Sequence, residues 1–520
     1  MPELTYDTSA TAVEMAELIF GDRVTVVGAT YTGDADASAI YSNGDAISPG
    51  VVPGDTGVIL STGEADRFTN DTGANTNVRT NTTTPNSGPN NDPDFVALAN
   101  RSTFDASFLE VDFIPDPGVD FITLEFVFSS EEYPEFSDSI YNDLFAVWID
   151  GEAVPLAAGD GLASVTNINQ SGDINLFNSN TGDQFNTEMD GFTVSMSFVV
   201  PVTPGEVNTL KIGISDVGDS AYDSNVLIAA DSVQGALIAN TDEVLLRPGD
   251  SRVVDVLAND INNTTGVAFI THINDQAVSP GDSVTLTTGQ TVTLNADGTL
   301  TLVGNAVSED VAFTYEIAST TGDTAVGFII VDTVPCFVAG TMIRTARGEV
   351  PVDRLQIGDL VLTRDDGLQP VRWIGTRVVP AEGKMAPVRI AANTLGDHGA
   401  VSVSPLHRVL VRNAHAELLY GSSEVLVAAR DLIDGRAITQ VNGGMVQYVH
   451  LLFDRHQVVW SNGLLSESFL PGPQTTGSFE QDMVEELRAI FPSLDPATGA
   501  GYGPAARPSL KRYEARLLVA

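Results

Sequence analysis

The chain has 520 residues and a formal net charge of −44, with 69 acidic and 25 basic residues. This acidic balance argues against nucleic acid or an anionic membrane surface as a partner, because both are bound by clustered Lys and Arg. A hydrophobic content of 43% excludes wholesale disorder. The length predicts about three or four domains.

The sequence contains no candidate membrane span and no recognisable leader at its start. No apolar run reaches the roughly 20 residues that a transmembrane helix needs. The first residues, Met1–Asp7, are acidic and lack the basic start and apolar core of a secretory signal. We therefore expect a protein that stays inside the cell or is exported by a route without an N-terminal signal.

The first part of the chain predicts one helix followed by β structure. Residues 11–20 carry Ala12, Met15, Ala16 and Ile19 at the spacing of one helix face. Short runs rich in β-branched and aromatic residues follow, separated by Gly, Asp, Asn and Pro; examples are residues 121–128, 144–149 and 192–199. This spacing is typical of a β-sandwich. Residues 69–93 have almost no apolar side chain and predict a long loop.

Two dense acidic clusters lie within this β-rich region, at residues 130–138 with 141–143 and at residues 215–225. Carboxylates this close repel one another unless a cation joins them, and Ca²⁺ prefers such oxygen ligands. The alternative is that these are solvated loops of a very acidic protein. The candidate calcium ligands are Glu131, Glu132, Asp143, Asp216 and Asp219.

The same clusters carry a family resemblance. The segments Phe126-Val-Phe-Ser-Ser-Glu-Glu-Tyr-Pro-Glu-Phe136 and Ile214-Ser-Asp-Val-Gly-Asp219 resemble the bacterial choice-of-anchor L domain over roughly residues 8–235. The resemblance implies a cell-surface or secreted domain without catalytic activity. We expect this domain, a β-sandwich, to occupy residues 1–240.

Residues 241–334 predict a separate β unit. Asp297-Gly298 between alternating apolar residues is a hairpin signal. The unit resembles the cadherin- or immunoglobulin-like repeats of large bacterial adhesins, which implies a β-sandwich that serves as a spacer.

Charge and cysteine content both mark a boundary near residue 335. Residues 1–335 hold 50 of the acidic residues but only seven of the basic ones, whereas the remainder is almost neutral. The single cysteine, Cys336, lies on this boundary. One cysteine excludes an intramolecular disulfide framework and a multi-cysteine zinc site. A lone cysteine is ordinarily a small buried hydrophobe, but its place at a boundary suggests a chemical role.

The segment that begins at Cys336 resembles the Hedgehog/intein (Hint) domain over about residues 335–472. Cys336 is followed by Gly340-Thr341 and Gly358-Asp359, as at the start of that all-β, horseshoe-like fold. Ser404-Pro-Leu-His407 resembles its Thr-x-x-His block, and Phe453-Asp-Arg-His456 resembles its late histidine block.

The residues of this segment suit an N-to-S acyl shift. A thiolate is a good nucleophile near neutral pH, so attack by Cys336 on the preceding carbonyl would convert the Pro335–Cys336 amide into a thioester. A histidine suits protonation of the departing nitrogen. The resemblance assigns that role to His407, with Ser404 as a hydrogen-bonding partner that polarises the same amide and His456 assisting later. The substrate is then the chain's own N-terminal region, and the acceptor of the thioester is not identified by the sequence.

Three departures from the family pattern shape this prediction. Ser404 replaces the family threonine and keeps the hydroxyl. Glu467-Ser468 stands where splicing inteins end in His-Asn, so we expect cleavage without splicing. Pro335 precedes the nucleophile, and its fixed φ limits how the scissile carbonyl can turn.

Other residues of this half have less specific readings. His398, His415 and His450 are interpreted as ordinary core histidines. Residues 473–520 predict a tail with a short helix that begins near Ser478, where Gln481 completes a capping box. The basic, amphipathic residues 506–520 would either dock on the Hint domain or act as an export signal.

The sequence therefore predicts a mostly β, multidomain protein with the boundaries given above. The leading hypothesis is a secreted or surface bacterial protein whose Hint domain cleaves the chain at Pro335–Cys336. The alternative is a non-catalytic, calcium-binding adhesion or matrix protein in which the Hint fold is inert. A conventional hydrolase is disfavoured, because no Gly-x-Ser-x-Gly, His-Glu-x-x-His or phosphate-loop motif occurs.

Overall fold

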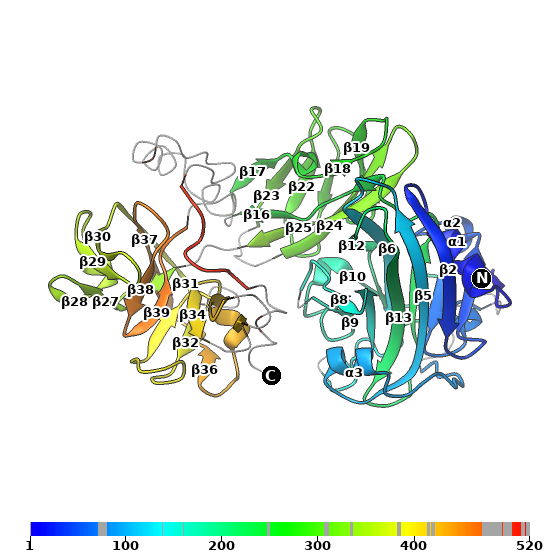
Figure 1. Cartoon of the computed structure of the whole chain (residues 1–520), viewed down its shortest axis with the longest axis horizontal. Helices are drawn as coiled ribbons and strands as arrows, with labels where there is room; N and C mark the ends of the chain where they lie inside the picture. The colour runs from blue at the N-terminus through cyan, green and yellow to red at the C-terminus, as the bar shows by residue number, and fades with distance from the viewer. Residues whose placement is uncertain are drawn as a thin grey trace. The chain divides into compact units, whose positions relative to one another are not determined.

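The fold is built mainly from strands (Figure 1), as the sequence predicts. The computed structural model describes residues 2–70, 81–137, 139–159, 161–246, 250–305, 311–332, 336–381, 386–412, 416–417, 422–470, 491, 502–510 and 515. The described chain divides into two compact units. The first comprises Met1–Asp242, Arg252–Val303 and Val311–Ile330, and the second comprises Glu243–Ser251, Gly304–Asp310 and Val331–Ala520.

The N-terminal part of the first unit is a sandwich of two sheets. One sheet has the order β1-β3-β4-β14-β6-β11-β10, with β12 also paired to β6. Its strands are β1 (Thr5–Asp7), β3 (Ser38–Ser42), β4 (Thr56–Ser61), β14 (Ser224–Ala229), β6 (Phe121–Ser130), β11 (Gly191–Thr193), β10 (Phe177–Ser179) and β12 (Met196–Pro201). The other sheet has the order β2-β5-β13-β7-β8, with β9 paired to β7. Its strands are β2 (Val24–Thr32), β5 (Thr103–Pro115), β13 (Asn208–Val217), β7 (Leu144–Ile149), β8 (Glu152–Val154) and β9 (Ala163–Ser164).

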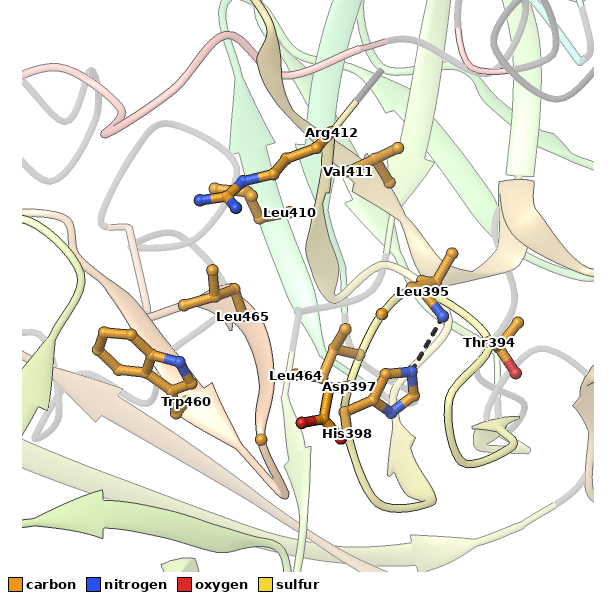
Figure 2. Close-up of a pocket in the computed structure, with 12 residues that line it drawn as sticks. Thr394, Leu395, Asp397, His398, Leu410, Val411, Arg412, Trp460, Leu464 and Leu465 are labelled. Atoms are coloured by element: carbon orange, nitrogen blue, oxygen red, sulfur yellow. Dashed lines mark hydrogen bonds between the residues drawn. The ribbon is translucent and has the colours of Figure 1, made fainter.

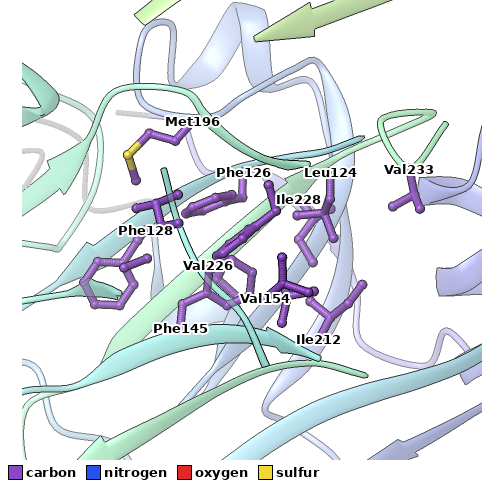
Figure 3. Close-up of a cluster of buried hydrophobic side chains, with 14 of the residues drawn as sticks. Leu124, Phe126, Phe128, Phe145, Val154, Met196, Ile212, Val226, Ile228 and Val233 are labelled. Atoms are coloured by element: carbon purple, nitrogen blue, oxygen red, sulfur yellow. The ribbon is translucent and has the colours of Figure 1, made fainter. Parts of the chain in front are cut away.

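The two sheets share one aromatic and aliphatic core (Figure 3). Phe126 of β6 contacts Phe145 of β7 and Phe198 of β12, with ring centroids 4.6 Å and 5.2 Å away, and those two rings are 5.8 Å from each other. Ile212 of β13 and Val226 of β14 are fully buried in the same cluster. Side chains of both sheets therefore interdigitate, which is the arrangement expected of a β-sandwich.

Three α-helices are described: α1 (Ala12–Ile19), α2 (Gly44–Ile47) and α3 (Pro93–Ala99). The first confirms the helix predicted at residues 11–20. Thr11 caps it, because its hydroxyl accepts from the Glu14 N–H while the Glu14 carboxylate accepts from the Thr11 N–H. Met15, Ala16 and Ile19 are its buried face. None of the helices in the described ranges is long and apolar enough to span a membrane.

Three further sheets follow the sandwich along the chain, with the orders β15-β18, β16-β25-β24-β19-β20 and β17-β23-β22-β21. Their strands are β15 (Leu237–Ile238), β16 (Asp242–Leu245), β17 (Ser251–Val254), β18 (Ile261–Asn262), β19 (Ala268–Ile273), β20 (Gln276–Ala277), β21 (Ser283–Thr285), β22 (Thr291–Leu294), β23 (Leu300–Val303), β24 (Val311–Ser319) and β25 (Thr324–Asp332). Ala312 and Phe328 join the core of the N-terminal sandwich. Gln234 also donates to the Thr324 carbonyl at 3.2 Å, so this region packs closely on the sandwich.

The second unit contains two sheets. One has the order β31-β37-β26-β33-β32-β36 and the other the order β28-β27-β29-β38-β39-β34-β35, with β30 paired to β29. The strands are β26 (Phe337–Val338), β27 (Met342–Thr345), β28 (Gly348–Pro351), β29 (Leu360–Thr363), β30 (Gly367–Pro370), β31 (Trp373–Pro380), β32 (Val388–Ile390), β33 (Val401–Val403), β34 (Arg408–Arg412), β35 (Glu424–Ala428), β36 (Ile438–Gln440), β37 (Met445–Leu452), β38 (Val458–Ser461) and β39 (Leu464–Glu467). The helix predicted near Ser478 lies outside the described residues.

Candidate functional site

The backbone of Cys336 is fixed between two strands at the start of the second unit. In the antiparallel register, Phe337 of β26 pairs with Val449 of β37 on one side and with Val403 of β33 on the other. Ser404 then holds Cys336 twice. Its hydroxyl accepts from the Cys336 N–H at 2.7 Å, and its own N–H donates to the Cys336 carbonyl at 2.9 Å. Ser404 therefore sets the position of the amide nitrogen that the predicted reaction would release.

The thiol of Cys336 faces a histidine. Its Sγ lies 3.3 Å from Nε2 of His450, and both side chains are buried. The imidazole is held by aromatic rings: Trp373 stacks on it at 6.4 Å between centroids, and Phe469 meets it edge-on at 5.5 Å. A neutral imidazole nitrogen at this distance can take the thiol proton. The pair therefore has the arrangement of a nucleophile with its base.

Tyr448 lies beside this pair and shares a small buried cluster with Cys336. Burial and then the charge of the Cys336 thiolate raise the pKa of Tyr448. The phenol of Tyr448 therefore stays protonated near neutral pH.

His407 lies close to Ser404 and to Phe337, the residue that follows the nucleophile. A turn in which the His407 N–H donates to the Ser404 carbonyl at 3.0 Å brings the two residues together, and the His407 ring packs on Phe337 with centroids 4.4 Å apart. Neither ring nitrogen has a hydrogen-bonding partner among the described residues. Burial lowers the pKa of His407 to about 4, against the opposing effect of Glu467. The ring is therefore neutral at pH 7, with both nitrogens available to the reaction.

Glu467 is a buried anion that links His407 to His456. Its Oε1 accepts from the Arg408 N–H at 2.9 Å, and its Oε2 lies 3.4 Å from Nε2 of His456. Burial alone would raise the pKa of Glu467, but the charge of Arg408 and the two histidines hold it at about 2. Glu467-Ser468 stands where splicing inteins end in His-Asn. In this chain the Glu467 carboxylate is therefore part of a buried charge cluster.

The predicted site residues are thus only partly gathered around the sulfur. Ser404 contacts Cys336 directly, His407 packs on the next residue, and His456 is connected through Glu467. Pro335, the other side of the predicted scissile bond, lies outside the described residues.

His450 is the site residue that sequence reasoning missed, because it was interpreted as a core histidine. Strand alternation was the available signal. Val446 and Tyr448 of β37 share a face with Cys336, whereas Val449 and Leu451 point into the opposite core, so His450 follows Tyr448 onto the cysteine face. The pairing of β37 with β26 could not be read from the sequence.

Of the other two histidines interpreted as core residues, His398 is described and lies in a different part of the unit. His398 lines a cavity of about 620 Å³ together with Asp397, Arg412 and Trp460 (Figure 2). Its Nε2 accepts from the Leu395 N–H at 3.0 Å, and neither Cys336 nor His450 lines this cavity. His415 lies outside the described residues.

Three of the five predicted calcium ligands are close together in the first unit. Oε2 of Glu132 accepts from the Asp143 N–H at 3.4 Å, and the Asp143 carboxylate accepts from the Val217 N–H and the Ser224 hydroxyl. Burial, followed by the charge of Asp143, raises the pKa of both Glu132 and Asp216. Oδ1 of Asp216 has no hydrogen-bonding partner among the described residues.

The remaining two candidates have partners of their own. The Glu131 carboxylate accepts from the N–H groups of Thr82 and Asp190 at 2.7 and 3.1 Å, and burial raises its pKa to about 8. Asp219 accepts from the Ala221 N–H at 3.1 Å. Within the described ranges, no group of three or more His, Cys, Asp or Glu side chains has an arrangement that would hold a metal ion. Calcium binding therefore stays a prediction.

Comparison with known families identifies two domains. The family model described as Hint domain matches residues 335–473, and the choice-of-anchor L domain model matches residues 5–234. The chain therefore contains a Hint domain and a choice-of-anchor L domain. No curated protein matches the chain.

The solved structures to which parts of the chain are similar include an intein and an intein-like domain. The gp41-1 intein is 13% identical, with 25% of this chain and 97% of that chain covered and a TM-score of 0.17. The bacterial intein-like domain from Clostridium thermocellum is 19% identical, with coverages of 26% and 98% and a TM-score of 0.19. A third is the M60 catalytic domain with the CBM51-1 and CBM51-2 domains from Clostridium perfringens ZmpB, at 13% identity, coverages of 70% and 34%, and a TM-score of 0.14.

Proposed function

We propose that the Hint domain cleaves its own chain at Pro335–Cys336 through a thioester, without splicing. The observation that carries the proposal is the 3.3 Å contact between the Cys336 sulfur and His450 Nε2, in a cysteine whose backbone is held on both sides by Ser404. Packing alone does not require a ring nitrogen to point at a thiol, and Cys336 carries the only thiol of the chain.

The reaction begins with transfer of the Cys336 thiol proton to Nε2 of His450, and the sulfur forms a bond to the carbonyl carbon of Pro335. The bond between that carbon and the Cys336 nitrogen then breaks, and the nitrogen takes up a proton. His407, whose ring is neutral because burial lowers its pKa, acts as a relay: one ring nitrogen donates its proton to the departing nitrogen while the other takes up a proton, and the thiol proton first held by His450 balances the step. Neither ring nitrogen has another hydrogen-bonding partner among the described residues. Water or another nucleophile then attacks the thioester, which restores the thiol and releases residues 1–335.

The absence of splicing follows from the residues near the end of the Hint match. Splicing needs an asparagine that cyclises, and Glu467-Ser468 stands at that position. The Glu467 carboxylate is engaged by Arg408 and His456, so we assign it a supporting role in the charge cluster.

The N-terminal domain sets the biological context of the proposal. A choice-of-anchor L domain suggests a cell-surface or secreted protein, and this one carries nearly all of the negative charge. Cleavage would release or transfer an acidic, adhesin-like region of residues 1–335. The acceptor, if it is not water, would be a nucleophile at the surface where the protein resides.

The test is incubation of the purified chain with added thiol, followed by SDS gels and mass determination of the products. We expect fragments 1–335 and 336–520 from the wild type and an intact chain from Cys336→Ala. A wild-type chain that stays intact for days under these conditions would overturn the proposal and favour the inert-module alternative. Fragments of the same masses from Cys336→Ala would also overturn it.

A further inference from the structure

The C-terminal segment of residues 502–510, here called the strap, lies beyond the Hint match and packs on the Hint domain. Ser509 pairs in parallel with Leu426 of β35. The Leu426 N–H donates to the Pro508 carbonyl, and the Leu510 N–H donates to the Leu426 carbonyl, both at 2.8 Å. Because β35 is the last strand of its sheet, the strap covers an edge whose backbone groups would otherwise need other partners.

Side chains fix the strap at both of its ends. The Arg507 guanidinium donates two hydrogen bonds to the Asp365 carboxylate, at 2.8 and 3.1 Å, and one to Glu424 at 2.9 Å. The Tyr502 hydroxyl donates to the Phe453 carbonyl at 2.8 Å, and Leu510 is buried in the core beneath β35. A bidentate contact of arginine with a carboxylate fixes direction as well as distance, so the strap has one register on the domain.

Between these anchors the strap contacts His456. The Ala506 N–H donates to Nδ1 of His456 at 3.0 Å. A backbone N–H can only donate, so Nδ1 must accept and carries no proton. The neutral ring then has its proton on Nε2, which lies 3.1 Å from the Ser468 carbonyl and 3.4 Å from Oε2 of Glu467. The strap thereby determines that the His456 nitrogen nearest the buried carboxylate carries the ring proton, which it donates to the Ser468 carbonyl.

Glu467 in turn lies close to the chain at His407, because its Oε1 accepts from the N–H of Arg408, the next residue. His407 and His456 both interact electrostatically with this carboxylate, which Arg408 holds from a third side. We propose that Ala506 is a positioning residue: its N–H locks His456 in the Nε2–H tautomer and so keeps Glu467 in place next to His407. The effect of Ala506 on catalysis rests on the proposed cleavage reaction. The tautomer of His456 does not depend on cleavage.

The test compares Ala506→Pro, which deletes the N–H, with Ala505→Pro as the matched control. No hydrogen bond of the Ala505 N–H occurs in the described part of the chain. Nitrogen chemical shifts of ¹⁵N-histidine in an uncleavable Cys336→Ala background report the tautomer, and His456→Gln assigns the signal. We expect a single Nε2–H tautomer in the parent and in Ala505→Pro, and a mixture in Ala506→Pro. Unchanged His456 shifts in Ala506→Pro would overturn the proposal.

Cleavage rate gives a second readout. One hydrogen bond corresponds to about fivefold in rate, so we expect Ala506→Pro to slow cleavage by about that factor and Ala505→Pro to leave it unchanged. Equal slowing by both would overturn the proposal.

If Ala506→Pro does not fold, hydrogen exchange of the Ala506 amide decides: it should be slow in the parent and fast in His456→Gln. If no variant cleaves, the proposed function fails, while the nitrogen shifts still decide the role of the strap.

Discussion

Two buried histidines lie near the nucleophile, one against its sulfur and one against the next residue, and their surroundings suit them to different steps. His450 directs Nε2 at the sulfur between two aromatic rings, which suits the removal of the thiol proton. His407 packs on Phe337 with both nitrogens unpartnered among the described residues, which suits a later exchange of a proton with the amide nitrogen. The two roles can be separated by substitution at each position.

His450→Gln is expected to slow cleavage by about 10²–10⁴-fold, because a positioned acid or base contributes about that much. His398→Gln is the matched control, since the two histidines have the same exposure of 6% in the same unit and the hydrogen bonds of His398 join it to Leu395 and Gly399. The measurement is the rate of appearance of the fragment that begins at Cys336. Loss of less than about threefold for His450→Gln, or equal loss for both variants, would rule out His450 as the base.

The lowered pKa of His407 also predicts how the free energy of unfolding of the Hint unit depends on pH. Burial lowers the pKa of His407 from 6.5 to about 4. Between these two pH values the unfolded chain binds a proton at His407 and the folded chain does not. Unfolding is therefore favoured increasingly as the pH falls from 6.5 to 4. Denaturant unfolding monitored by tryptophan fluorescence should show this loss in Cys336→Ala and a smaller loss in Cys336→Ala with His407→Gln. The same slope in both chains would contradict the assignment.

At the scale of elements, the N-terminal sandwich depends on the aromatic residues between its sheets. Phe126 is fully buried and contacts two other rings. We expect Phe126→Ala to lower the free energy of unfolding of the first unit by about 3–5 kcal/mol, because it leaves a cavity in a close-packed core. Val27→Ala on β2, where the side chain is 57% exposed, should change it by less than about 0.5 kcal/mol. Equal effects of the two changes in denaturant unfolding would contradict this description of the core.

The carboxylates at the ends of β6, β7 and β13 predict a response to calcium. Burial raises the pKa of Glu132, Asp143 and Asp216, so folding takes up protons, and without a cation stability falls as the pH rises above the unfolded values near 4. A bound ion would offset this loss at pH 8, since it stabilises only the folded state.

Hydrogen exchange at pH 8 measures this response locally. We expect faster exchange in peptides around Glu132 and Asp216 when a chelator is added, and no response to chelator in Asp216→Asn. Exchange that is identical with and without calcium in the unsubstituted chain would end the calcium hypothesis.

Elements with local signals were predictable, and those that depend on distant pairing were not. The apolar periodicity of residues 11–20 predicted the helix α1, and the ordered motifs around Cys336 and Ser404 predicted two residues that do lie in contact. His450 was missed because its role requires β37 to pair with β26, more than 100 residues earlier in the chain. The contact of Ala506 with His456 was equally hidden, since neither residue carries a local signal of it.

At the scale of the molecule, the chemical boundary near residue 335 coincides with the start of the Hint match. The residues before Cys336 carry nearly all of the net charge of −44. Cleavage there would separate the strongly acidic region of residues 1–335 from the nearly neutral Hint domain. The central claim is therefore that a thioester forms at Pro335.

Hydroxylamine tests that claim most directly, because it attacks a thioester far faster than an amide and leaves a hydroxamate on the released carbonyl. The purified chain is incubated with hydroxylamine at neutral pH, and the products are identified by intact mass and by sequencing of the terminal peptides. The account predicts residues 1–335 ending in a hydroxamate at Pro335, together with a fragment that begins at Cys336, and neither product from Cys336→Ala. An intact chain, or cleavage at any other bond, would contradict it.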